Sequence, residues 1–379
     1  MTSRRQWFKA AAGLTAGFVA IPSLVEELMA APVSEAERFH RFEANGTIVR
    51  LGSNENPYGP SPKAREAVIA SLNEGNRYAF EATQEFKKFL AEKEGVTVDH
   101  IMIGNGSSEL LCVAGIGIGL EGKRVVSPFP TFRLLMDFAE KMGATWDRVN
   151  LNDQLAMDLE ATAAAVKADT KMLFLVNPNN PTGTLTAPDQ YKAFCEEMSK
   201  KTTVYSDEAY LEFLAPAQQQ SMVELIKQGK DVIVSRTFSK IYGLAGLRLG
   251  YVIAQPDRIK QMSKYQMGGG VNINQAVLAA AKASANDTAF MNMTREKNTS
   301  ARKVLEDYLT KKGWFFGKSH INLLFFPAPI NGKTILAKTQ EAGYQIRVWD
   351  YAGKEWCRVS IGTEAEMKGF VKAFDSIVG

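Results

Sequence analysis

One stretch of the chain, residues 235–250, reads S-R-T-F-S-K-I-Y-G-L-A-G-L-R-L-G and decides how the rest is interpreted. It begins where a predicted strand ends, and it holds Lys240 in a loop rich in glycine, serine and threonine, with Arg248 eight residues on. A lysine flanked by hydroxyl groups and an arginine suits an amine nucleophile beside a bound phosphate. For a lone lysine a solvated surface position would be the better interpretation, so the choice depends on the neighbouring sequence.

Short β-rich runs alternate with helical patterns from about residue 100 to residue 255. The predicted strands are His100–Ile103, Arg124–Ser127, Thr145–Leu151, Lys171–Val176, Thr202–Ser206, Asp231–Ser235 and Arg248–Ala254. The predicted helices between them include Glu109–Leu120, Phe132–Met142 and Pro188–Lys200. This alternation predicts an α/β fold with a mainly parallel sheet sandwiched by helices, in which ligands bind at the carboxyl ends of the strands.

The pattern changes near residues 268–270, where three glycines follow one another. A long helical segment is predicted from Gln275 to Lys312, followed by apolar runs and a last helix from about Glu364. The apolar runs are Ile321–Phe326, Tyr344–Trp349 and Trp356–Ile361. We therefore expect a large domain over residues 76–275 and a smaller α+β domain over residues 276–379, to which an N-terminal arm, residues 32–75, contributes in part.

Composition narrows the class of protein. Of 379 residues, 45% are hydrophobic and 23% are charged, with a net charge of +4, which is the balance of an ordinary globular protein and does not favour nucleic acid as a partner. The three cysteines and three histidines are widely spaced and show no metal-ligand pattern. We therefore predict no structural or catalytic metal site.

The first residues, M-T-S-R-R-Q-W-F-K, differ from everything that follows. Arg4, Arg5 and Lys9 precede an uncharged run, Ala10–Ile21, that is too short to span a bilayer, for which about 20 residues are needed. The segment resembles a twin-arginine export signal, with cleavage near residues 30–31. Residues 1–31 are thus predicted to direct the folded protein to the periplasm through the twin-arginine export machinery; an amphipathic helix with an accidental arginine pair is the alternative.

Three further loops follow predicted strands. Gly104–Glu109 reads G-N-G-S-S-E and opens a helix, so its amides suit an anion, although a simple capped turn would look the same. Asn177–Gly183 reads N-P-N-N-P-T-G and presents an asparagine amide rigidly, or forms a turn with no ligand. Asp207, in V-Y-S-D-E-A-Y, lies among apolar neighbours, where an N-cap is the alternative to a functional carboxylate.

Taken together, these four loops resemble the class I/II pyridoxal-phosphate-dependent aminotransferases of fold type I, and within them the histidinol-phosphate aminotransferase branch. The motifs N-P-N-N-P-T-G, D-E-A-Y and S-x-T-F-S-K-x-x-G-L-A-G-L-R-x-G occur in the family's order, and L-G-S-N-E-N-P-Y-G-P-S-P-K-A is like the branch's N-terminal motif. The resemblance covers nearly all of the chain beyond about residue 45. It implies a mainly parallel seven-stranded sheet and pyridoxal 5'-phosphate as the cofactor.

The resemblance also implies roles for individual residues. Lys240 would form the Schiff base with the cofactor and move the proton at the substrate Cα, while Asp207 would pair with the pyridine nitrogen. Asn180 and Tyr210 would hydrogen-bond the phenolate oxygen, and Phe132 would stack on the ring in place of the family's usual tyrosine. The residues that would hold the phosphate are Ser107, Ser108, Thr237, Ser239 and Arg248.

Other residues are implied in oligomerisation and substrate binding. Tyr78 corresponds to a tyrosine that reaches the phosphate of the partner subunit, which implies a homodimer with shared active sites. Arg358 would clamp the substrate α-carboxylate, and Tyr58 and Asn322 would also contact the substrate. Arg347 lies where the branch places an arginine for the distal phosphate of histidinol phosphate; a side-chain carboxylate or a surface ion pair would suit it equally.

The first functional hypothesis is therefore an aminotransferase that moves an amino group from an L-amino acid, or from an amino-phosphate such as histidinol phosphate, to a 2-oxo acid, with pyridoxamine phosphate between the half-reactions. Decarboxylation or racemisation on the same scaffold is the alternative reaction. A degenerate scaffold with a binding role is the third hypothesis, which retention of Lys240 and Asp207 argues against. An exported enzyme would have poor access to cytoplasmic histidinol phosphate, so the donor stays open.

Overall fold

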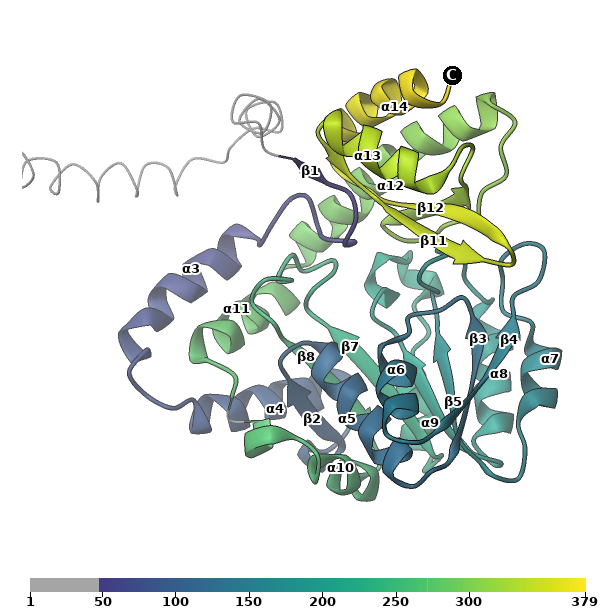
Figure 1. Ribbon diagram of the computed structural model, residues 1–379. Helices are drawn as coiled ribbons and strands as arrows, with labels where there is room; N and C mark the ends of the chain where they lie inside the picture. Colours follow the sequence, from purple (N-terminus) through teal and green to yellow (C-terminus); the bar gives the residue numbers. More distant parts are fainter. Residues whose placement is uncertain (1–47, 271) are drawn as a thin grey trace, which may run out of the picture. The chain divides into compact units, whose positions relative to one another are not determined.

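The structure is a computed structural model that describes residues 48–270 and 272–379 (Figure 1). The predicted export signal, residues 1–31, and residues 32–47 of the predicted arm lie outside the described residues. Among the helices that are described, none combines the length and the apolar character needed to cross a membrane.

Seven strands of the described chain form one sheet in the order β2-β8-β7-β6-β5-β3-β4. Their bounds are β2 Ile101–Gly104, β3 Arg124–Phe129, β4 Thr145–Asn150, β5 Thr170–Val176, β6 Thr203–Asp207, β7 Val232–Thr237 and β8 Gly250–Ala254. Within this sheet β8 runs antiparallel to both neighbours, and the pairs from β7 to β4 are parallel. The mainly parallel seven-stranded sheet predicted from the sequence is confirmed.

Helices cover both faces of this sheet, as Figure 1 shows. Their bounds are α4 Phe80–Glu94, α5 Ser107–Leu120, α6 Leu134–Lys141, α7 Leu159–Ala165, α8 Pro188–Met198, α9 Val223–Lys227, α10 Pro256–Ser263 and α11 Gln275–Ala285. Neighbouring strand residues point to opposite faces, so Val204 joins an apolar core with α4, α8, α9 and α11, whereas Tyr205 joins a second core with α5, α6 and α10. Burial on both faces explains why a central strand such as β5 reads as a continuous apolar run.

The C-terminal part of the chain builds a separate core on a smaller antiparallel sheet, ordered β11-β12-β9. Its elements are α12 Thr288–Lys311, β9 Leu323–Pro327, α13 Gly332–Glu341, β11 Arg347–Tyr351, β12 Lys354–Ser360 and α14 Glu364–Val378. A two-stranded parallel pair, β1 Val49–Arg50 with β10 Tyr344–Gln345, brings the start of the described chain to this core. The segment that follows β1 can therefore reach the carboxyl ends of the large sheet before α3, Pro62–Ser71.

The helical segment predicted from Gln275 to Lys312 is in fact two helices. The α11 helix ends at Ala285, and the Asp287 side chain caps α12 by accepting a hydrogen bond from the Phe290 amide at 3.4 Å. A capping aspartate favours a new helix start over continuation of the old helix. The remaining short elements are the 3-10 turns η1 Leu72–Glu74, η2 Val98–His100, η3 Leu211–Phe213, η4 Pro216–Gln218 and η5 Met267–Gly270.

Candidate active site

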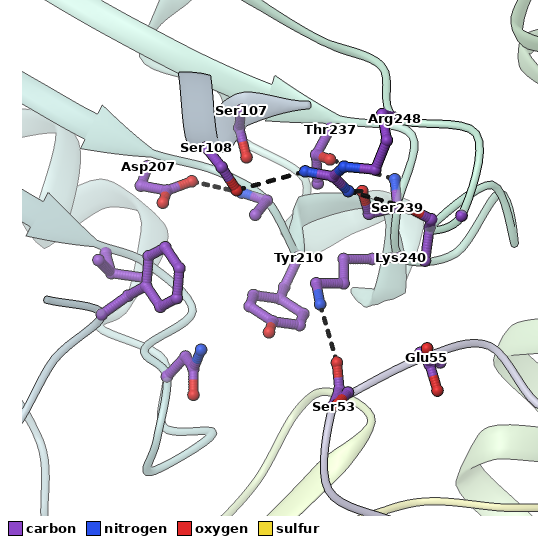
Figure 2. Close-up of a pocket in the computed structure, with 16 residues that line it drawn as sticks. Ser53, Glu55, Ser107, Ser108, Asp207, Tyr210, Thr237, Ser239, Lys240 and Arg248 are labelled. Carbon is purple, nitrogen blue, oxygen red and sulfur yellow. Dashed lines mark hydrogen bonds between the residues drawn. The ribbon is translucent and has the colours of Figure 1, made fainter. Parts of the chain in front are cut away.

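A cavity of about 280 Å³ lies where β2, β5, β6 and β7 end (Figure 2). Its lining residues are Ser53, Glu55, Ser107, Ser108, Phe132, Val176, Asn180, Asp207, Ala209, Tyr210, Thr237, Ser239, Lys240, Ala245, Gly246 and Arg248. Eleven residues were assigned to the cofactor from the sequence. Ten of them line the cavity, and Tyr78 is the exception. Loops from the carboxyl ends of four strands that run in the same direction thus meet at one place, as this type of sheet requires.

The amine of Lys240 lies inside this cavity. Its Nζ donates hydrogen bonds to the carbonyl oxygens of Ser53 and Asn54, both at 3.3 Å, and lies 5.6 Å from the centre of the Tyr210 ring. Figure 2 shows the Lys240 side chain extending toward Ser53. The Asn54 amide in turn donates to the Tyr210 hydroxyl at 2.8 Å, and Asn54 itself has a left-handed φ of 53°. The segment after β1 therefore packs directly against the predicted nucleophile.

Cationic and hydroxyl groups gather on another side of the cavity. The Arg248 guanidinium donates to the hydroxyls of Ser239 at 3.3 Å and Ser108 at 3.4 Å. Gly106 is the N-cap of α5 at a φ of 77°, and a Cβ there would lie 2.3 Å from Nη2 of Arg248. Since the amides at the start of a helix and a guanidinium both favour negative charge, these groups form a cradle for a phosphate.

Asp207 ends β6 with 3% of its surface exposed. Its Oδ1 accepts a hydrogen bond from the Ala209 amide at 3.1 Å. Burial raises the pKa of Asp207 to about 6, the neighbouring Glu208 carboxylate adds to the rise, and the Ala209 amide and the Lys240 ammonium oppose it. A buried carboxylate of this kind is poised to pair with a cationic group of a ligand.

Replacing Asp207 by asparagine is expected to stabilise the cofactor-free protein above pH 6. The folded pKa of about 6 lies above the unfolded value of 3.8, so ionising the buried carboxylate costs stability as the pH rises through this window, by up to about 3 kcal/mol. Below pH 3.8 the Asp207 carboxyl group is protonated in both the folded and the unfolded state, so this cost in stability vanishes. The free energy of unfolding of Asp207→Asn and of wild type, measured in urea from pH 4 to pH 8, checks this prediction. An equal stability difference at pH 4 and at pH 8 would contradict it.

Arg358 and Asn180 connect the small sheet to the large one. Arg358 Nη1 donates to Asn180 Oδ1 at 2.9 Å and Nη2 donates to the Gly52 carbonyl at 2.5 Å, while its buried Nε has no hydrogen-bond partner among the described residues. Burial lowers the pKa of Arg358 to about 10, and the Arg347 cation contributes. The guanidinium stays charged at neutral pH, which suits a carboxylate ligand.

Besides Arg358, four predicted residues lie outside the lining of the cavity. Tyr78 is 83% exposed, and Arg347 is exposed on β11, where its Cα pairs with that of Arg358. Tyr58 is half-buried, with Lys297 Nζ 4.9 Å from its ring centre. Asn322 is buried, and its amide donates to the carbonyl oxygens of Asn54 and Glu55 at 3.1 and 3.3 Å. Asn322 thus supports the segment that contacts Lys240.

Sequence reasoning assigned no role to Ser53, Asn54 or Glu55, although they belong to the quoted stretch L-G-S-N-E-N-P-Y-G. Their importance could have been predicted, since this stretch is part of the motif that resembles the family. In the described part of the chain, no group of three or more histidine, cysteine, aspartate or glutamate side chains could hold a metal ion.

The donor set fits pyridoxal phosphate. The cavity combines an amine for the aldehyde, a guanidinium with hydroxyls for the phosphate and a buried carboxylate for the pyridine nitrogen, and the Phe132 ring also lines it. Together, the fold and this cavity define an α/β pyridoxal-phosphate-dependent transferase of fold type I.

Comparison with known proteins agrees with this class. Residues 46–374 match the model of the family aminotransferase class I and II. The chain is 34% identical over 348 residues to histidinol-phosphate aminotransferase 1 of Cupriavidus pinatubonensis, covering 91% of this chain and 92% of that one. It is also 34% identical over 349 residues to histidinol-phosphate aminotransferase 2 of Ralstonia nicotianae, covering 91% and 92%.

Solved structures show the same similarity. A putative histidinol-phosphate aminotransferase from Erwinia carotovora atroseptica is 33% identical, with a TM-score of 0.82 over 87% of this chain and 95% of that chain. The histidinol-phosphate aminotransferase of Sinorhizobium meliloti, solved with pyridoxal-5'-phosphate, is 25% identical, with a TM-score of 0.79 over 93% and 96%.

The chain belongs to the class I and II aminotransferase family. It is an enzyme, a pyridoxal-phosphate-dependent aminotransferase, and amino acids and oxo acids are consistent with this activity as its substrates.

Proposed function

We propose that the enzyme moves an amino group from an L-amino acid, or from an amino-phosphate such as histidinol phosphate, to a 2-oxo acid. The observation that carries this proposal is one cavity that holds the Lys240 amine, the buried Asp207 carboxylate and the Arg248 guanidinium, with Arg358 hydrogen-bonded to its wall through Asn180. The names of the relatives add histidinol phosphate as a candidate donor.

In this proposal Lys240, Asp207 and Arg358 have different roles in the reaction. Pyridoxal phosphate, when bound, supplies an electron-withdrawing ring that stabilises negative charge at the substrate Cα. Lys240 Nζ takes the proton from the substrate Cα and returns it, as a general base and acid. Asp207 holds a proton on the pyridine nitrogen, and Arg358 binds the substrate α-carboxylate through parallel N–H groups.

An anionic distal group on the donor is supported by Arg347. It is exposed on β11, directly opposite Arg358 in the β11–β12 register, so a donor gripped by Arg358 can extend toward a second guanidinium. A phosphate and a side-chain carboxylate both satisfy this arrangement.

Arg347→Met tests the distal group. We expect kcat/KM to fall about 10- to 100-fold for histidinol phosphate, glutamate and aspartate, the effect of one lost hydrogen bond to a charged group, and to stay unchanged for phenylalanine. The assay measures the 2-oxo acid or aldehyde formed from each donor. An equal loss for all four donors would remove Arg347 from substrate recognition.

We also propose a homodimer with shared active sites. Tyr78 and Phe80 are both exposed in the single chain, with ring centres 5.7 Å apart, which is a surface that a second subunit could cover. Sedimentation of the holoenzyme, with Tyr78→Ala as the variant, tests the idea. A monomer with full cofactor affinity would contradict it.

We further propose that the enzyme is exported to the periplasm by the twin-arginine machinery. The support is the sequence S-R-R-Q-W-F-K at residues 3–9, which lies outside the described residues. Replacing Arg4 and Arg5 together by lysine is expected to keep the enzyme in the cytoplasm, because the pathway reads the arginine pair. Fractionation of cells measures this, and unchanged periplasmic recovery would contradict the proposal.

A further inference from the structure

A buried ion-pair cluster lies directly behind the candidate active site. Glu208 follows Asp207 at the end of β6, and Arg236 precedes Thr237 near the end of β7; 1% and 6% of their surfaces are exposed. Arg236 Nε donates to Glu208 Oε2 at 2.9 Å, and Nη1 donates to Glu212 Oε1 at 2.8 Å. One guanidinium therefore joins two carboxylates.

The Glu208 carboxylate is held from several directions. Its Oε1 accepts a hydrogen bond from the Met222 amide at 2.7 Å, and its Oε2 accepts one from the Ser221 hydroxyl at 2.8 Å in addition to that from Arg236. The Glu208 amide donates to the Ser235 carbonyl at 3.0 Å, so the ends of β6 and β7 are tied together at this residue. Glu208 thus has a fixed position beside Asp207.

We propose that Glu208 and Arg236 are positioning residues for Asp207: their ion pair holds the Asp207 carboxylate in register with the Lys240 loop, and Glu208 supplies negative charge behind it. Adjacent strand residues point to opposite faces, so Glu208 acts from behind the site without touching a ligand. The proposal rests on the assigned role of Asp207 at the pyridine nitrogen.

The charge of the cluster favours this role over simple packing. Its carboxylates are Glu94, Glu208 and Glu212 and its guanidinium groups are Arg236 and Arg295, three against two. A buried ion pair contributes little net stability compared with apolar residues of similar size, so stability alone is a weak reason to place one here. Of these carboxylates Glu208 alone adjoins Asp207, and its negative charge favours a proton between Asp207 and a basic ligand atom.

The other titratable groups near the cluster do not cancel this charge. They are Tyr191, Cys195, Tyr242 and Tyr251, and burial raises the pKa of each, so they stay neutral. Burial and Glu208 both raise the pKa of Asp207, whereas the Lys240 cation on the cavity side lowers it. The charged groups that shift the pKa of Asp207 are thus one carboxylate behind it and one amine in front.

Glu208→Gln in the full-length holoenzyme tests the proposal, with Glu212→Gln as the matched control. Both variants remove a partner of Arg236, but only Glu208 adjoins Asp207. The readout is the pH at which the cofactor pyridine nitrogen loses its proton, followed by ¹⁵N NMR of bound ¹⁵N-labelled pyridoxal phosphate. We expect a downward shift of about half a pH unit or more for Glu208→Gln and none for Glu212→Gln.

Equal midpoints in Glu208→Gln and wild type would overturn the proposal. If Glu208→Gln does not fold, the double variant Glu208→Gln with Arg236→Gln removes the pair as a unit, and we expect a smaller downward shift because the Arg236 cation is lost together with the carboxylate. Asp207→Asn distinguishes the positioning role of Glu208 from the role of Asp207 at the pyridine nitrogen, on which it rests. A nitrogen that stays protonated at neutral pH in Asp207→Asn would refute the role of Asp207 itself rather than that of Glu208.

Discussion

Replacing Lys240 by alanine is expected to lower the rate of amino transfer by at least about 10⁴-fold, because the variant loses both the nucleophile and the group that moves the Cα proton. The Lys240 Nζ is the amine that lines the cavity, held by the carbonyl oxygens of Ser53 and Asn54. The rate is measured as 2-oxo acid formed from a saturating donor at neutral pH.

The fold should survive this change, since among the described residues the amine makes two long hydrogen bonds to the main chain and otherwise lies near the Tyr210 ring. Circular dichroism and thermal unfolding check that point. Lys264→Ala removes an exposed lysine just beyond α10 and is the matched control, expected to retain wild-type activity. A Lys240→Ala enzyme with more than a few per cent of wild-type activity would contradict the assignment of Lys240.

The second largest effect is expected from Arg358→Lys. Lysine keeps the charge but loses the planar fork, and with it the bonds to Asn180 and Gly52 that fix its direction and the Nε–H that has no partner in the described chain. The loss of two hydrogen bonds to a charged substrate group predicts a fall in kcat/KM of about 100-fold or more for every donor.

Arg347→Lys is the control for this change, because Arg347 lies opposite Arg358 in the same strand pair but is exposed. We expect Arg347→Lys to affect donors with a distal anion alone. The measurement is kcat/KM over a panel of acidic and neutral donors. An Arg358→Lys enzyme with wild-type kcat/KM would show that another residue binds the α-carboxylate.

Much of the large sheet could be predicted because its central strands are buried on both faces. Runs such as Met172–Val176 are apolar throughout, and the loops that follow them contain the glycine, proline and hydroxyl residues that mark strand ends. Since parallel strand ends meet at one edge, the convergence of Asp207, Asn180 and Lys240 followed from the topology.

The segment that contacts Lys240 could not be placed in the same way. Asn54 reaches its position through hydrogen bonds with Ser360, 306 residues away, and with Tyr210, 156 residues away. No local periodicity encodes such contacts, because they depend on how the small sheet packs against the loops of the large one. The bond between Arg358 and Asn180, 178 residues apart, has the same origin.

The ion pair of Glu208 and Arg236 behind the site could not be predicted from the sequence either. Glu208 and Arg236 lie just beyond the two predicted strands, Thr202–Ser206 and Asp231–Ser235. Recognising them as a buried ion pair required the β6–β7 register, which sets Asp207 beside Ser235. A single strand pattern shows which residues alternate in direction but not which ones face each other across two strands.

Transfer of nitrogen is the most direct test of the account. The holoenzyme is incubated with ¹⁵N-labelled L-amino acids other than alanine and glutamate, with labelled histidinol phosphate, and with unlabelled pyruvate and 2-oxoglutarate, and the label in alanine and glutamate is measured by NMR. We expect label in at least one of these products with the wild-type enzyme and in neither with Lys240→Ala. Carbon dioxide release or racemisation of a donor without any labelled product would contradict it.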